Sequence, residues 1–184
     1  MKIVVSESQY KRLIEAKEEQ KVLRIPSLKF FNDDWFQLQE FLETKGNPPY
    51  SVGGNLDLRR TPIKSLENLQ SVGGYLDLRD TPIESLGNLQ SVGGNLDLRR
   101  TPIKSLENLQ SVGGDVYLRG TPIKSLGNLQ SVDGYLELYR TPIESLGNLL
   151  SVGGVLDLEG TRLSKMYNEK QIHKMVNVED YIYL

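Results

Sequence analysis

Apolar side chains recur at fixed positions along most of this chain. Within residues 51–70 they fall at Val52, Leu56, Leu58, Ile63, Leu66 and Leu69. The same set returns every 20 residues as far as about residue 163. Leu56 and Leu58 are two residues apart, so their side chains point to one face of a short β-strand, with Asp57 on the other face. Beyond this strand the spacing widens to steps of five, three and three, which no long strand would show.

Two short motifs mark the corners of each 20-residue unit. Proline has a fixed backbone torsion and no amide hydrogen, so Thr61 and Pro62 predict the turn that follows the strand. Gly53 and Gly54 precede the strand, where side chains would crowd or a positive φ is required. Each unit is therefore predicted to form one turn of a coil.

Successive 20-residue units are nearly identical in sequence, which indicates a repeat architecture. Residues 51–70 recur unchanged at 91–110, and the units that begin at Ser71, Ser111, Ser131 and Ser151 are close variants. One such coil cannot bury enough apolar surface to fold alone, so its stability must come from stacked neighbours. The sequence predicts an α/β solenoid over residues 51–163, with a parallel β-sheet of about seven short strands.

Residues 1–50 differ in composition and predict an N-terminal capping segment, made of a short strand and two helices. Ser6 and Gln9 form a capping box that opens a helix to about residue 20. Asn32, Asp33 and Asp34 open a second helix that stops near Gly46. Its apolar side chains are expected to cover the open end of the solenoid, with a ligand pocket as the alternative.

Residues 164–184 predict one inserted helix and a last repeat strand. The segment 177–184 aligns with 71–78 and keeps apolar residues at the three corresponding positions, so residues 164–176 are interpreted as a helix within the sixth coil. The strand between Tyr181 and Leu184 has no following cap in the sequence. We expect it to pair edge to edge in a homodimer, or to be shielded by the inserted helix.

The pattern Leu56-x-Leu58-x-x-Thr61-x-Ile63-x-x-Leu66-x-x-Leu69 resembles the leucine-rich repeat, in the short form seen in bacterial and bacteriophage proteins. The resemblance covers residues 51–163 and the final strand. It implies a right-handed coil and an intracellular interaction role. The family's first leucine falls on Gly53, and Thr61 stands where the family has asparagine or cysteine. A pentapeptide-repeat coil is excluded, because steps of five from Leu56 would point polar residues inward.

Composition and charge exclude several classes of protein. The 184 residues contain no cysteine, which excludes a disulfide scaffold and a cysteine-ligated metal site. No apolar run approaches 20 residues, so a membrane span is not expected. The first apolar stretch is too short for a signal peptide, which predicts a cytoplasmic protein. With 22 basic and 24 acidic residues, the chain lacks the basic excess of a nucleic-acid coat.

The sequence offers little chemistry for catalysis, so a non-enzymatic protein without a cofactor is expected. The one histidine, His173, lies beside Lys170 and Lys174 in the predicted inserted helix. The Gly-Gly pairs precede strands and lack the lysine of a phosphate loop. Stacked aspartates at residues 57, 77 and 97 could bind calcium, but arginines two residues further on favour ion pairing instead.

The outward strand positions carry the candidate binding residues. Seven of the ten arginines fall on this face, whereas all lysines lie elsewhere. Arginine and tyrosine dominate binding hot spots. The predicted site consists of Tyr75, Asp77, Arg79, Asn95, Asp97, Arg99, Asp115, Tyr117, Arg119, Tyr135, Glu137 and Tyr139.

We expect this face to bind an unidentified protein. The tyrosines would be the anchors, and the arginines would pair with acidic groups of the partner. A carbohydrate or another polar small molecule is the alternative ligand. Eight acids offset the seven arginines of the face, so nucleic-acid binding is not favoured.

Overall fold

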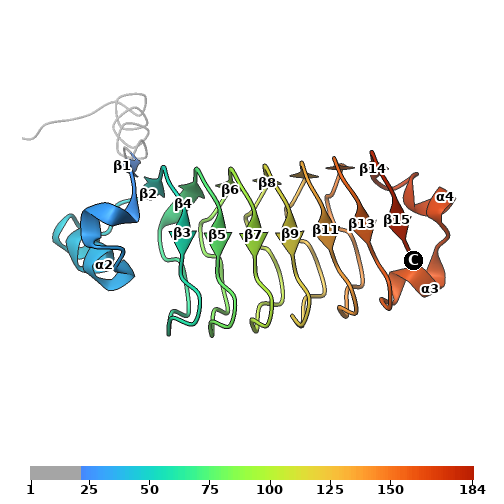
Figure 1. Ribbon diagram of the computed structural model, residues 1–184, viewed down its shortest axis with the longest axis horizontal. Coiled ribbons are helices and arrows are strands. Elements are labelled where there is room, and N and C mark those ends of the chain that lie inside the picture. Colours follow the sequence, from blue (N-terminus) through green and yellow to red (C-terminus); the bar gives the residue numbers. More distant parts are fainter. Residues whose placement is uncertain (1–21) are drawn as a thin grey trace, which may run out of the picture.

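The structure is a computed structural model that describes residues 22–184, so the helix predicted for residues 6–20 lies outside the described part. The repeats form a parallel β-solenoid in which successive coils stack along one axis (Figure 1). We number the coils from residue 51, so that coil one spans 51–70 and coil six begins at Ser151. The predicted solenoid of leucine-rich 20-residue units is confirmed.

Two parallel sheets run along the solenoid. One has seven strands: β3 (Leu56–Asp57), β5 (Leu76–Asp77), β7 (Leu96–Asp97), β9 (Val116–Tyr117), β11 (Leu136–Glu137), β13 (Leu156–Asp157) and β15 (Ile182–Tyr183). The other has eight: β1 (Leu23–Ile25), β2 (Tyr50–Val52), β4 (Leu69–Val72), β6 (Ser91–Val92), β8 (Ser111–Val112), β10 (Ser131–Val132), β12 (Ser151–Val152) and β14 (Asn177–Val178).

The predicted sheet of about seven strands is the first of these, and the second was not predicted. The strands of this eight-stranded sheet contain the valine of each unit. In the sequence pattern that valine is an isolated apolar position, which does not predict a strand. The register is in step between coils, with Ser91 opposite Ser111 and Val92 opposite Val112.

The core is a continuous stack of aliphatic side chains. In coil three, Leu96, Leu98, Ile103, Leu106 and Leu109 have no exposed surface. The threonine at each corner is satisfied within its own coil. Thr101, for example, is buried and donates its hydroxyl to the carbonyl of Leu98 at 2.8 Å. Because the threonine hydroxyl is hydrogen-bonded, its burial next to the core costs little free energy.

The paired glycines separate the two strands of each coil. A Cβ atom at Gly93 would lie 2.3 Å from the carbonyl oxygen of Gly73, and one at Gly94 would lie 3.0 Å from the backbone of the preceding coil. Crowding between coils therefore explains these glycines. Neither has a positive φ, so the other predicted reason does not apply.

The N-terminal segment extends the eight-stranded sheet and covers its first coil. Strand β1 pairs with β2 and is followed by the short 3-10 helix η1 (Leu28–Phe31) and by α2 (Trp35–Thr44). Asp34 caps α2 by accepting a hydrogen bond from the amide of Phe36 at 2.8 Å. Trp35 is buried and packs against Tyr50 at a ring distance of 6.5 Å. The helix predicted after Asp34 is thus confirmed, and it lies at one end of the stack (Figure 1).

The C-terminal segment contains two short helices where one longer helix was predicted. Helix α3 (Leu163–Met166) ends at Tyr167, whose backbone is extended, and α4 (Glu169–Ile172) begins after Asn168. Asn168 and Gln171 form a capping box, which starts a new helix at this point. Strands β14 and β15 then pair with β12 and β13, so the predicted last repeat strand is confirmed.

Candidate interaction face

The outward side of the seven-stranded sheet is called the outer face below. Side chains alternate along each strand, and this alternation assigns residues to the outer face. Leu76 and Leu78 point into the core, while Tyr75, Asp77 and Arg79 point away from it. Because the register does not shift between coils, equivalent residues form straight columns across the sheet. The sequence predicted these columns, and they differ between the two halves of the face.

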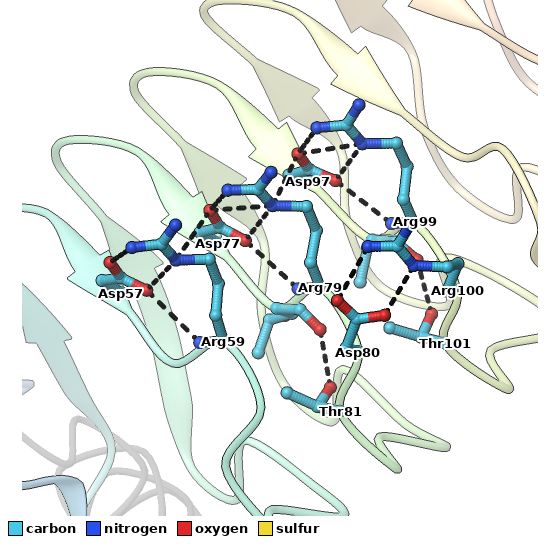
Figure 2. A network of polar contacts seen from close by, with 12 residues as sticks. Asp57, Arg59, Asp77, Arg79, Asp80, Thr81, Asp97, Arg99, Arg100 and Thr101 are labelled. Carbon is cyan, nitrogen blue, oxygen red and sulfur yellow. Dashed lines mark hydrogen bonds and ion pairs between the residues drawn. The ribbon is translucent and has the colours of Figure 1, made fainter.

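Coils one to three carry a row of ion pairs, which we call the Asp–Arg ladder (Figure 2). It consists of Asp57 with Arg59, Asp77 with Arg79, and Asp97 with Arg99. In each pair the arginine donates through Nε and Nη2 to the carboxylate two residues earlier. The predicted ion pairing between these aspartates and arginines is confirmed, although the sequence indicated diagonal pairs between coils and the pairs here lie within one coil.

The ladder also joins neighbouring coils. Nε of Arg79 lies 3.2 Å from Asp97, and Nε of Arg59 lies 3.5 Å from Asp77. The side chains of Asp77 and Asp97 are almost covered by these contacts, with 13% and 12% exposed. Hydrogen bonding to Asp77 raises the pKa of the Arg79 guanidinium above its usual value. The Nε and Nη2 donors of these arginines are therefore engaged within the protein.

A second group of charges borders the ladder at the turn after each strand. Arg100 binds Asp80 through two hydrogen bonds, and Arg60 lies 3.9 Å from the same carboxylate. The Arg100 guanidinium lowers the pKa of Asp80. Between these residues and the ladder lies a depression of about 440 Å³.

Coils four and five carry an aromatic cluster, which we define as Tyr117, Tyr135 and Tyr139. The rings of Tyr117 and Tyr135 meet edge to face at 6.0 Å. Arg119 lies over the ring of Tyr139 at 5.1 Å. All three tyrosines are half-buried, so their rings are held in place yet keep an exposed surface. The structure thus brings these four predicted residues together.

The two inner tyrosines are fixed by carboxylates. Tyr117 donates its hydroxyl to Asp115 at 2.9 Å, and Tyr135 donates to Asp157 of the next coil at 2.9 Å. Burial, followed by these hydrogen bonds, raises the pKa of both phenols. Both rings therefore remain neutral and oriented at physiological pH.

Glu137 lies among these tyrosines and differs from the other acids. Its Oε2 is buried and has no hydrogen-bond partner within residues 22–184. Burial raises the pKa of this carboxyl group, and the positive charges of Arg99 and Arg119 oppose the shift. Within residues 22–184, Glu137 is the one residue with a buried polar side-chain atom that has no hydrogen-bond partner.

Two predicted residues, Tyr75 and Asn95, are not part of the aromatic cluster. Tyr75 is 40% exposed and borders a depression of about 690 Å³ between coil one and the N-terminal segment. Asn95 serves the fold, because its Oδ1 accepts a hydrogen bond from the amide of Asp115 in the next coil at 2.9 Å.

Asp115 has the same structural role and accepts from the amide of Tyr135. The recurrence of Asn and Asp in this column is the sequence signal for this link, and the same residues were predicted only as binding surface.

The segment proposed for dimerisation is the outermost strand of its sheet. Strand β15 pairs with β13 and has no other strand partner among the described residues. Tyr181 and Tyr183 are exposed, whereas Ile182 packs partly against the core. A homodimer through this strand stays a prediction.

The described residues show no metal or membrane chemistry. No group of three His, Asp or Glu side chains within residues 22–184 is arranged to hold a metal ion. In the same range, every helix is too short or too polar to cross a bilayer. Comparison with protein-family models, with curated proteins and with solved structures finds no match to this chain.

Proposed function

We propose that this chain is a non-enzymatic protein-binding solenoid, and that the aromatic cluster with Arg119 forms the centre of its binding surface. The arrangement of Tyr117 and Tyr135 carries the proposal. Both rings are fixed by hydrogen bonds to carboxylates, so they lose little conformational freedom when a partner covers them. Tyrosine supplies a large contact area with a polar end, which is typical of interface hot spots.

The distribution of charge supports coils four and five over coils one to three. The arginines of the Asp–Arg ladder already hold aspartates, whereas Arg119 has Tyr117 at the corresponding position and contacts a ring instead. Arg119 is exposed and keeps its guanidinium donors for a carboxylate of the partner.

We also propose that the repeats belong with the short leucine-rich repeats. The spacing of leucines supports this assignment, as does the seven-stranded parallel sheet in which Leu56 and its equivalents are buried. Solenoids of stacked repeats offer extended, rigid surfaces that suit protein binding.

The proposal is tested with a photoreactive amino acid placed at Glu159, an exposed position that follows Tyr139 in the same column of the outer face, or, for comparison, at the exposed Lys64 of coil one. We expect protein adducts from a cell extract at position 159 that disappear in Tyr117→Ala and Tyr135→Ala. Phe30→Ala is the matched control, because Phe30 is 74% exposed but lies on η1, outside the outer face.

Two results would contradict the proposal. Adducts that survive both tyrosine variants would exclude the aromatic cluster as the anchor. An adduct that resists protease and yields to glycosidase would favour carbohydrate, the alternative ligand of this face.

A further inference from the structure

The depression beside the Asp–Arg ladder has an unusual set of lining groups. We call it the arginine depression and define it by Asp57, Arg59, Arg60, Arg79, Asp80 and Arg100. Four guanidinium groups and two carboxylates give the lining a formal charge of +2. Asp77 and Asp97 lie just outside this lining and pair with Arg59 and Arg79, so part of its positive charge is compensated.

The guanidinium groups of the depression retain unused donors. Arg79 and Arg100 each pair with aspartate through Nε and Nη2, and Nη1 stands outside these bonds (Figure 2). Arg60 has a side chain that is 83% exposed, and its contact with Asp80 is long, at 3.9 Å. Each guanidinium carries five N–H donors, so the depression can still donate several hydrogen bonds to an anion.

Arg60 and Arg100 occupy the left-handed position of the turn that follows each outer strand. Arg60 and Arg100 have φ values of 58° and 60°, in the left-handed region. In coils four and six the same position is Gly120 and Gly160, with φ values of 77° and 72°. Glycine adopts this conformation without a steric penalty, whereas arginine does not. Asp80 and Arg140 share the conformation, with φ values of 57° and 53°, so the turn belongs to the repeat and fixes where these side chains leave the backbone.

We propose that the arginine depression binds a phosphate dianion, either free or esterified to a side chain of a partner. The Nη1 donors of Arg79 and Arg100 and the exposed guanidinium of Arg60 supply the hydrogen bonds for this ligand. Phosphate oxygens accept bidentate hydrogen bonds from guanidinium groups, for which arginine is better suited than lysine. The site lies in coils one to three, so it is separate from the aromatic cluster and does not depend on it.

The test is a titration of the protein with inorganic phosphate, at a pH of about 8 where the dianion dominates and at constant ionic strength. The arginine Nε–H resonances are observed by NMR. We expect saturable shifts for Arg60, Arg79 and Arg100. Arg60→Gly and Arg100→Gly should each weaken binding about tenfold, the loss of one charge-assisted contact.

Arg140→Gly is the matched control. Arg140 occupies the same repeat position with a φ of 53°, but it lies in coil five, outside the depression. All three glycine variants copy a residue that coils four and six already contain, so they are expected to fold.

A second arm separates the two sources of phosphate. Tighter binding of a phosphoserine peptide than of inorganic phosphate would assign the site to a phosphorylated partner, and equal binding would assign it to free phosphate. Either result supports the proposal. Absence of saturable shifts, an equal loss in Arg140→Gly, or equal binding of a peptide with glutamate in place of phosphoserine would overturn it. A negative result in the phosphate titration does not affect the proposed role of Tyr117 and Tyr135, because the cross-linking experiment uses a different ligand and different variants.

Discussion

Arg79 lies across the boundary between two coils, with its Nε 3.2 Å from the carboxylate of Asp97 while its Nη2 holds Asp77 at 2.6 Å. One guanidinium therefore links the strand that carries it to the next strand of the sheet. In a solenoid each coil contacts only its neighbours, so such a link acts on the interface that determines stability. The ladder thus stabilises the stacking of neighbouring coils.

The ladder predicts unequal effects of aspartate substitutions. Asp77→Asn should lower the free energy of unfolding by about 1–3 kcal/mol, because a covered charge-assisted hydrogen bond is lost and two guanidinium groups lose their shared partner. Asp57→Asn should cost less than about 1 kcal/mol, since the side chain of Asp57 is 40% exposed and solvent screens its ion pair. Urea unfolding measures both variants, and equal losses would contradict the role of the ladder between coils.

Crowding at the second glycine of each pair predicts that alanine substitutions in different coils destabilise the protein unequally. A Cβ at Gly94 would meet three backbone atoms of the preceding coil at 3.0–3.2 Å, whereas a Cβ at Gly54 meets Pro26 and Ser27 at 3.5–3.6 Å. Gly94→Ala should therefore destabilise the protein by about 1–3 kcal/mol, as overpacking does. Gly54→Ala has the same position in coil one and should change stability by less than about 0.5 kcal/mol. Thermal unfolding compares them, and a harmless Gly94→Ala would show that the coils can separate at this point.

The buried carboxyl group of Glu137 predicts a dependence of stability on pH. Burial raises its pKa above the ordinary 4.5 in the folded protein, so the folded state binds more protons than the unfolded state between the two values. The contribution of Glu137 is thus present below about pH 4.5 and is lost as the pH rises through the raised pKa. Glu137→Gln should be more stable than the original protein at neutral pH, with a difference that shrinks on acidification. Urea midpoints across this range check the sign, and a constant difference would contradict it.

The outermost strand predicts a test of the homodimer. Its bonds to β13 run from the amides of Leu156 and Leu158 to the carbonyls of Tyr181 and Tyr183. The amide of Ile182 is not a donor in these bonds, so Ile182→Pro removes an edge donor and leaves them intact. We expect sedimentation of the original protein to show a dimer, and that of Ile182→Pro a monomer. Ile182→Val controls for lost packing, and a monomeric original protein would exclude the dimer.

The sequence predicted what depends on spacing, and missed what depends on contacts between coils. The alternation at Leu56 and Leu58 was enough to assign the outer face, and Asp34 was enough to begin α2. The second sheet was missed because only Val52 and its equivalents signal it. The split of the outer face could not be predicted either. It arises because Tyr117 replaces an aspartate, which leaves Arg119 without the partner that Arg79 has.

This split predicts opposite phenotypes for two arginines in equivalent positions. Arg119→Ala should weaken adduct formation with the partner by about tenfold, the effect of a hot-spot residue. It should change the free energy of unfolding by less than about 0.5 kcal/mol, because Arg119 is exposed and holds no aspartate. Arg79→Ala should leave adduct formation unchanged at temperatures where the variant is folded. It should destabilise the protein, since Asp77 and Asp97 would lose a shared donor while remaining covered. Binding and urea unfolding are measured on both variants. If both arginines affected binding equally, the partner would cover coils two to five alike, and the aromatic cluster would not be the centre of the surface.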